Sequence, residues 1–222
     1  MVLTEDLGKM FEMAICLLYK TPYSGNYKYG LDCPNTIIPK IQKLLDYFPA
    51  CTHTAEKGSR YDFTSSDGKF LSAKTTKQDK KVCPQVIGQP TKKGFCESFD
   101  LPTDSSNDVI KNYISNNFKS MLTKYFDHTF DCDIVYYNRH TDTVLFVRTK
   151  EPINWDTEKF DFSHIRKNKK WNESSTLYLV KDDKTHTLGE FQVHNHRNCI
   201  KFRWNFENVL SLFPDNFEVT KF

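Results

Sequence analysis

The sequence predicts a mixed α/β (α+β) protein in which helices flank a central mixed sheet and the C-terminal half is rich in strands. Three segments place apolar residues three and four positions apart, the spacing of one helix face. Other short runs are rich in β-branched and aromatic residues and end at polar turns, as paired strands do. With 38% hydrophobic and 14% aromatic residues, the 222-residue chain can bury a substantial core. We therefore expect one domain over residues 1–222, with a core part in 1–100 and a helix plus β-rich part in 101–222.

The three predicted helices each carry one apolar stripe. Thr4 can cap the first, whose stripe runs from Leu7 to Leu18. The second spans Asn35 to Phe48, with Pro39 in the first turn, where proline is tolerated. The third spans Ser106 to Tyr125 and is the most regular. We expect all three to pack against the sheet.

The predicted strands come mostly in pairs. Arg60 to Lys77 forms a hairpin around a polar turn, Ser65-Ser66-Asp67-Gly68. After it come an irregular basic loop up to Phe99, the Ser106 helix and a hairpin of strands 131–137 and 143–149. A loop or short helix from Lys159 to Trp171 precedes a second hairpin, of strands 174–181 and 187–193. The chain then forms a strand that includes Ile200, Phe202 and Trp204, a short helix over 206–213 and a tail after Pro214.

Composition excludes several classes of protein. A balance of 31 Lys+Arg against 28 Asp+Glu gives a net charge of only +3, so affinity for a polyanion must come from local clusters. No apolar run is long enough for a membrane span, and the first 20 residues carry charges unlike a signal peptide. The seven cysteines are scattered and never form C-x2-C, which favours reduced, packed thiols. We expect a cytoplasmic, intracellular protein that does not act on a membrane.

The hairpin from Arg60 to Lys77 brings three polar residue types together. Asp62 lies on the first arm, and Ser72 and Lys74 lie two residues apart, hence on one face of the second arm. A carboxylate that binds a divalent ion beside an ammonium that orients water is a minimal apparatus for hydrolysing a phosphodiester. The alternative, a surface pair of Asp62 and Lys74 without chemistry, stays open.

Two polar segments have the residue types that contact DNA. In the loop from Val82 to Lys93, glutamine can read adenine and lysine can bind phosphate; the candidates are Gln85, Gln89, Lys92 and Lys93. Between two later strands, the candidates are His194, Asn195, His196, Arg197, Lys201 and Arg203. A solvated loop and a plain polar turn are the alternatives, and His194, His196 and Cys199 also have a weak zinc interpretation. The basic, aromatic segment from Lys159 to Trp171 suits either nucleic acid or solvent.

The order of these parts resembles the PD-(D/E)xK nuclease superfamily, in particular its type II restriction endonucleases. The resemblance rests on a helix with Glu12, a strand with Asp62, a strand with Ser72-Ala73-Lys74 and the basic segments that follow. The ending EFQVHNHRNCIKFRW is similar to the closing strands of some members. A restriction-endonuclease-like fold is therefore expected.

The resemblance implies a role for each matching position. Asp62 would bind the metal, helped by the carbonyl of Ala73, and Lys74 would position and help deprotonate the attacking water. Glu12 would match the helix acid that some members carry at the site. Tyr61 stands where the motif has Pro, and Ser72 stands where it has Asp or Glu. A hydroxyl binds Mg2+ more weakly than a carboxylate, so Glu12 or Asp67 would have to supply the missing charge.

The implied activity is Mg2+-dependent hydrolysis of double-stranded DNA at a short specific sequence. Cutting both strands requires two sites or two events, so a homodimer and a monomer acting twice are both open. Two rival functions also stay open. One is a sequence-specific nucleic-acid-binding protein without catalysis. The other is a nuclease that uses His194, Asn195 and His196, for which the last helix offers only Glu207 and Asn208 as partners.

Overall fold

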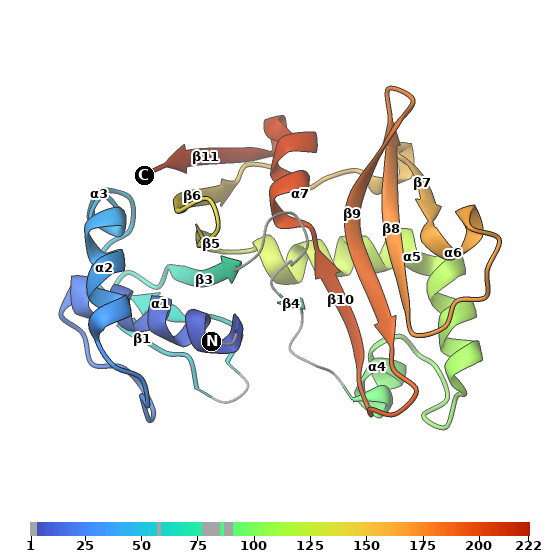
Figure 1. Cartoon of the computed structure of the whole chain (residues 1–222), viewed down its shortest axis with the longest axis horizontal. Helices are drawn as coiled ribbons and strands as arrows, with labels where there is room; N and C mark the ends of the chain where they lie inside the picture. The colour runs from blue at the N-terminus through green and yellow to red at the C-terminus, as the bar shows by residue number, and fades with distance from the viewer. Residues whose placement is uncertain (1–3, 57–58, 77–84, 87–90) are drawn as a thin grey trace. The chain divides into compact units, whose positions relative to one another are not determined.

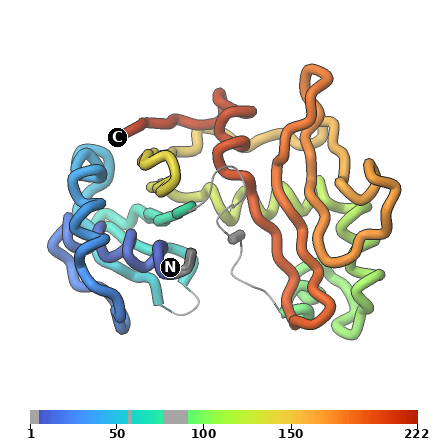
Figure 2. The backbone as a smooth tube through the Cα atoms, viewed as in Figure 1, coloured from blue at the N-terminus to red at the C-terminus, as the bar shows by residue number. Residues whose placement is uncertain are grey.

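The computed structural model describes residues 4–56, 59–76, 85–86 and 91–222. The chain divides into two compact units, each built from separate stretches of sequence (Figures 1 and 2). Unit 1 comprises residues 1–79, 130–150 and 215–222, and unit 2 comprises residues 80–129 and 151–214. Residues 101–222 thus contribute to both units, whereas sequence reasoning assigned them to one continuous part. Within the described ranges, no helix is long and apolar enough to cross a membrane.

Unit 1 contains a six-stranded mixed sheet with the strand order β1-β2-β3-β5-β6-β11. Its strands are β1 (Cys51–His53), β2 (Phe63–Ser65), β3 (Phe70–Thr76), β5 (Asp133–Asn138), β6 (Thr143–Thr149) and β11 (Phe217–Lys221). All neighbours pair antiparallel except β3 and β5, which run parallel. The predicted mixed α+β class with a central mixed sheet is confirmed, as are both predicted hairpins of this unit.

Helix α1 (Thr4–Tyr19) packs against β1 and β3. Its predicted apolar stripe is buried, and Leu7 and Phe11 join Leu71 and Val135 in one core cluster. Burial of each such side chain contributes about 1.5–3 kcal/mol, so this face sets the position of α1 on the sheet. The helix therefore covers the face of β3 that carries Leu71 and Ala73.

The second predicted helix is two helices. Helix α2 spans Asp32–Ile41, and α3 spans Leu44–Tyr47. Because α2 begins three residues earlier than predicted, Pro39 lies inside the helix and not in its first turn. Pro39 cannot donate a backbone hydrogen bond to the carbonyl of Asn35, and the helix ends two residues after it.

Unit 2 contains a five-stranded antiparallel sheet with the strand order β4-β10-β9-β8-β7. Its strands are β4 (Gln85–Val86), β7 (Lys159–Phe162), β8 (Ser174–Lys181), β9 (Lys184–Val193) and β10 (Ile200–Trp204). Helix α5 (Asn107–Phe130) packs aromatic side chains on one face of this sheet; the rings of Tyr125 and Phe202 stack at 4.9 Å. Helix α7 (Phe206–Leu212) follows β10, as predicted.

Three predicted elements were wrong in part. The segment 159–171 begins as strand β7, an edge strand paired with β8, before the short helix α6 (Ser163–Arg166). The basic loop contains helix α4 (Lys92–Ser98), which Thr91 caps by accepting from the Gly94 N–H. The tail after Pro214 forms β11, which pairs with β6. Pairing between distant strands decides β7 and β11, and local periodicity does not report it.

Candidate functional site

Asp62 and Lys74 meet at the hairpin of β2 and β3. The Ala73 N–H donates to Asp62 Oδ2 at 2.7 Å, and Lys74 Nζ donates to the same oxygen at 3.3 Å. The two side chains are 20% and 22% exposed, so the pair is reachable from solvent. Asp62 Oδ1 has no hydrogen bond within the described residues. One carboxylate oxygen is thus held by the protein, and the other is available.

Alternation along β3 places Ser72 and Lys74 on the face opposite α1. Leu71 and Ala73 belong to the core under α1, so their neighbours project to the other side of the sheet. Ser72 is 3% exposed. The predicted convergence of Asp62, Ser72 and Lys74 in one place is therefore present in the fold.

Cys132, just before β5, also lies at this site, although sequence reasoning did not single it out. Burial raises its pKa to about 11, while a hydrogen bond with Ser72 and the positive charge of Lys74 act in the opposite direction. The negative charges of Asp131 and Asp62 raise the pKa further. Cys132 is consequently a neutral thiol at physiological pH, adjacent to the three predicted residues.

Asp131 is a second carboxylate close to the pair that sequence reasoning missed. It accepts a hydrogen bond of 2.5 Å from Tyr61, and Arg60 binds it at 2.8 Å. Tyr61 and Arg60 immediately precede Asp62, so these contacts tie the first arm of the hairpin to the start of β5. The acidic run at 131–133 was visible, but the parallel pairing of β3 and β5 that brings it here was not.

Glu12 lies on the other face of the sheet. Its Oε2 contacts His53 Nε2 at 3.3 Å and accepts from the Tyr23 hydroxyl at 3.2 Å. His53 is buried beside Phe63, and its Nδ1 accepts from the Ser24 N–H at 2.9 Å, which leaves the proton on Nε2 to be donated to Glu12. The structure therefore joins Glu12 to His53 and Tyr23, and not to Asp62.

Asp67 also lies away from Asp62. It occupies the exposed turn of the hairpin, where Ser65 donates to it and Lys69 binds it at 3.1 Å. The hydrogen bond from Ser65 and then that from Lys69 lower the pKa of the Asp67 carboxyl. Gly68 has a φ of +81°, which the turn requires. Asp67 thus serves the turn.

The DNA-contact candidates that the structure describes lie in unit 2. Lys201 and Arg203 share one face of β10, across from Gln192 and Glu190 of β9, while Phe202 faces α5. Gln85 of β4 is the register partner of Arg203; Gln89 lies outside the described residues. Lys201 is 5% exposed without an ion pair to any described residue, and burial lowers its pKa.

The turn between β9 and β10 presents its polar side chains to solvent. Asn195, His196 and Arg197 are exposed. The backbone is held in place by Glu173, whose Oε1 accepts from the Asn195 N–H at 2.9 Å. This backbone hydrogen bond is the main reason that the pKa of Glu173 is lowered. His194 is half-buried, with its Nδ1 3.7 Å from Glu173 Oε2.

Lys92 and Lys93 open helix α4. The Lys92 N–H donates to Asn198 Oδ1 at 3.0 Å, which connects α4 to the same turn. Lys93 is exposed, 3.7 Å from Glu97 one helical turn away. The structure thus brings the Lys92 backbone, the turn and β10 together in one unit, and Asp62, Ser72 and Lys74 together in the other.

Metal-binding geometry is limited in the part of the chain that the structure describes. No three His, Cys, Asp or Glu side chains gather there closely enough to hold a metal ion, and His194, His196 and Cys199 are no exception. Mg2+ differs from zinc because it takes oxygen ligands, keeps several waters and is satisfied by one or two carboxylates. The oxygen atoms around Asp62 fit that requirement.

Comparison with known proteins gives one relative. The type II restriction enzyme CviAII of Paramecium bursaria Chlorella virus 1 is 51% identical over 220 residues, which is 99% of this chain and 63% of that enzyme. No family model matches the sequence, and no solved structure matches the chain. The chain is therefore similar over nearly its whole length to a type II restriction enzyme, and it spans 63% of the length of that relative.

Proposed function

We propose that the protein is a Mg2+-dependent endonuclease that hydrolyses double-stranded DNA at a short specific sequence, as a type II restriction enzyme does. The observation that carries this proposal is the meeting of Asp62 and Lys74, both reachable from solvent, with the buried Ser72 on one face of the sheet. Its similarity to CviAII, whose name describes a type II restriction enzyme, supports the same conclusion.

In this proposal Asp62 is the principal metal ligand. Its Oδ2 is engaged by Ala73 and Lys74, so its Oδ1 would hold the ion, together with the Ala73 carbonyl and the Ser72 hydroxyl. Mg2+ bound there would polarise a phosphate oxygen and lower the pKa of a coordinated water. Asp131 is not assigned as a ligand, because its Oδ2 accepts a hydrogen bond from Tyr61 and pairs with Arg60.

Lys74 would orient the attacking water and stabilise the negative charge that builds on the phosphoryl oxygens. The oxygen of water bonds to phosphorus and the proton of the water passes to solvent. The bond from phosphorus to the leaving ester oxygen breaks, and that oxygen takes a proton from solvent to leave as a hydroxyl. Lys74 can do this because Asp62 holds its ammonium group at the site.

Glu12 is assigned a positioning role and not a place in the metal shell. It belongs to α1 and contacts His53 on the face of the sheet that the core covers. Its contacts with His53 and Tyr23 fasten the segment after α1 to strand β1. Substitution of Glu12 should therefore lower the free energy of unfolding more than it lowers the rate of the chemical step.

Sequence recognition is assigned to unit 2. Arg197 and Arg203 would contact guanine, Asn195, Gln85 and Gln89 would contact adenine, and His194 and His196 would support the turn. Lys92 and Lys93 would bind phosphates, and Lys201, which is only 5% exposed, would add positive charge to this unit. This assignment fits a homodimer that cleaves both strands at once, and it fits a monomer that cleaves them in successive events.

The test is digestion of a plasmid of known sequence in Mg2+, with EDTA as a control. Wild-type protein should give discrete fragments, and Asp62→Asn or Lys74→Ala should lower the rate by on the order of a hundredfold or more. Lys69→Ala is the matched control, because Lys69 lies in the same hairpin but 63% exposed at its turn. DNA binding without cleavage by the wild type would instead establish a binding protein. Cleavage lost on His194→Ala but retained in Lys74→Ala would move the chemistry to the turn.

A further inference from the structure

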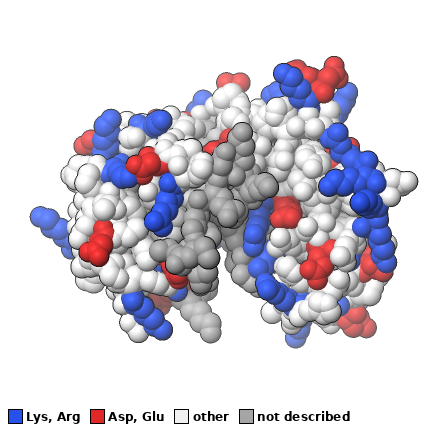
Figure 3. Space-filling model, viewed as in Figure 1, with Lys and Arg blue, Asp and Glu red and all other residues white. Residues whose placement is uncertain are grey.

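Residues 163–170 form a short basic element that the proposed function leaves unused. We call this element, Ser163-His164-Ile165-Arg166-Lys167-Asn168-Lys169-Lys170, the basic hook; it carries four cationic residues and no acid. It consists of α6 and the residues that fold back after it. Figure 3 shows Lys and Arg side chains gathered over this segment, and a second band over β10, on the same face of unit 2.

The hook is held in one conformation by its own backbone. Asn168 has a φ of +47°, its N–H donates to the Ile165 carbonyl at 2.9 Å, and the Lys169 N–H donates to the His164 carbonyl at 2.9 Å. This pair of bonds around a left-handed residue is the Schellman motif that ends many helices. The motif therefore fixes the backbone from which the cationic side chains project.

Side chains fasten the hook to the edge of the sheet. His164 Nδ1 lies 2.7 Å from Ser175 Oγ, and Ser163 Oγ accepts from the Thr176 N–H at 3.0 Å. The His164 ring also stacks on Trp171, with centroids 5.2 Å apart. Ser175 and Trp171 are buried, so these contacts attach the hook to the core of unit 2.

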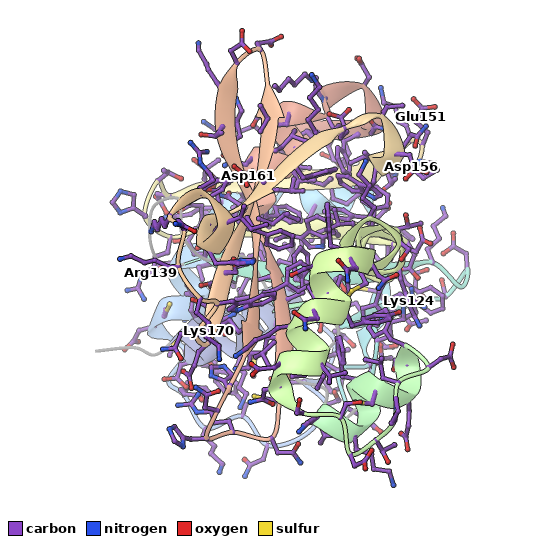
Figure 4. All side chains as sticks on the ribbon, turned by 90° about the vertical axis from the view of Figure 1, so that its right-hand side faces the viewer. Lys124, Arg139, Glu151, Asp156, Asp161 and Lys170 are labelled. Atoms are coloured by element: carbon purple, nitrogen blue, oxygen red, sulfur yellow. The ribbon has the colours of Figure 1, made fainter. Side chains whose placement is uncertain are left out.

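Of the four cationic residues of the hook, only the first and the last contact protein partners. Arg166 lies 3.6 Å from Asp161 and over the ring of Tyr178, and Lys170 lies 3.6 Å from Asp108. Figure 4 shows Asp161 beside α6 and places Lys170 and Lys124 on opposite sides of α5. Lys167 and Lys169, between those ends, are exposed and have no ion pair with any described residue.

Ile165 is the unusual member of the hook. It is 60% exposed, more than any other large hydrophobic side chain in the part of the chain that the structure describes. An isoleucine displayed between cations is unfavourable in water, and nothing in the Schellman motif requires an apolar residue there. Proteins that kink DNA insert such apolar side chains between base steps while neighbouring cations hold the phosphates.

Resting on the proposed function, we propose that the basic hook is a second DNA-contacting element: Lys167 and Lys169 bind phosphates, and Ile165 enters a groove as an apolar wedge that distorts the duplex. Double-stranded DNA fits because it offers a row of phosphates flanking an apolar stack of bases, and it is the substrate in the proposed function. A rigid anchor is what insertion requires, because a mobile residue would be pushed aside by the bases.

The phosphate contacts are tested by the dissociation constant for a short labelled duplex as a function of salt. In Lys167→Gln/Lys169→Gln the slope of log Kd against log salt should fall by about two relative to wild type, with affinity lowered for every sequence alike. Lys43→Gln/Lys221→Gln is the matched control, since it removes the same charge from exposed lysines of unit 1. Equal slopes for the two double variants would overturn the assignment of the hook.

The wedge is tested with a duplex that carries the cleavage site found in the plasmid digest, labelled at its ends and with 2-aminopurine at successive positions. The protein carries Asp62→Asn, so that DNA is bound in Mg2+ without being cut. Ile165→Ala should lose the rise in 2-aminopurine fluorescence and the shortening of the end-to-end distance, and Ile165→Leu should restore both. Leu45→Ala, at a comparably exposed leucine of unit 1, should behave as the parent.

Failure of this inference is distinguishable from failure of the proposed function. If the wild type binds DNA without cutting it, the nuclease proposal fails. The dependence of log Kd on log salt, measured with any duplex, still tests whether Lys167 and Lys169 bind phosphates. An unchanged fluorescence signal in Ile165→Ala would refute the wedge even if cleavage is normal. Binding to anionic lipid vesicles that depends on Ile165, with unchanged DNA slopes, would assign the hook to a membrane surface and overturn the proposal.

Discussion

Asp62 owes its orientation to the backbone as much as to Lys74. The Ala73 N–H that binds its Oδ2 belongs to the neighbouring strand, so the carboxylate is fixed wherever that strand is fixed. Ion pairs that solvent reaches contribute only about 0–1 kcal/mol to stability, and the half-buried side chains of Asp62 and Lys74 keep 20% and 22% of their surface in contact with solvent. The pair is therefore better explained by what it does at the site than by what it adds to the fold.

Cys132 provides a test of the site that leaves the acidic residues unchanged. Only the thiolate reacts with iodoacetamide, and with a pKa of about 11 Cys132 should react slowly at neutral pH and about tenfold faster for each pH unit up to that value. Alkylation places a bulky group beside Ser72 and should abolish DNA cleavage. The extent of reaction is measured by peptide mass spectrometry alongside plasmid cleavage.

The control for this experiment is Cys132→Ser, which should cleave DNA before treatment and resist inactivation. It separates Cys132 from Cys33, which is also partly exposed. Rapid alkylation of Cys132 at neutral pH, or full activity of the alkylated protein, would contradict the geometry described for the site.

At the scale of the elements, β3 organises unit 1 and the pair β9–β10 organises unit 2. β3 sends Leu71 and Ala73 into the core under α1 and presents Ser72 and Lys74 on its other face. In β10, Phe202 and Trp204 lie in the core, and Lys201 and Arg203 lie on the other face. Each strand thus joins an apolar face that fixes its position to a polar face that carries candidate site residues.

Gly189 sets how closely β9 approaches β10. A methyl group at this position would lie 2.6 Å from the Arg203 carbonyl oxygen and 2.7 Å from the Phe202 ring. Because a backbone atom cannot move aside cheaply, Gly189→Ala should lower the free energy of unfolding by about 1–3 kcal/mol and disturb Arg203. Urea denaturation and DNA affinity measure the two effects. Gly30→Ala, where nothing lies within 4 Å of the added methyl, should be nearly neutral, and equal stability of the two variants would refute this account of the strand pair.

At the scale of the whole molecule, chemistry and recognition are assigned to different compact units. The hairpin of Asp62 and Lys74 belongs to unit 1, and both β10 and the basic hook belong to unit 2. The two functions should therefore be separable by substitution.

We expect Asp62→Asn to bind DNA with a Kd within about threefold of wild type while cleavage is lost, because few phosphate contacts are removed. Arg203→Ala should weaken binding to the cleavage site, with loss of discrimination at one base pair, while residual cleavage keeps its dependence on Mg2+. Fluorescence anisotropy and plasmid cleavage on the same preparations measure both properties. Parallel loss of binding and cleavage in both variants would argue against separate roles for the units.

Much of the local structure could be predicted from the sequence. The apolar stripe of α1, the turn at Gly68 and the shared face of Ser72 and Lys74 depend on residues only a few positions apart. Pro39 also indicates the end of α2, because proline inside a helix removes a backbone hydrogen bond. The predicted start of α2, Asn35, is three residues later than the observed start, Asp32. Errors of this kind concern boundaries, where local preferences are weakest.

The sequence by itself determined the mixed class of the fold, most of its helices and strands, and the trio of Asp62, Ser72 and Lys74, because short-range periodicity and turn chemistry encode these features. Only the tertiary structure decided that β11 returns to pair with β6, that the strands form two sheets, that Asp131 and Cys132 stand beside the trio, and that Glu12 turns to His53. The physical reason is that these contacts join residues far apart along the chain. Their partners are selected by the packing of the whole core, which no local pattern records.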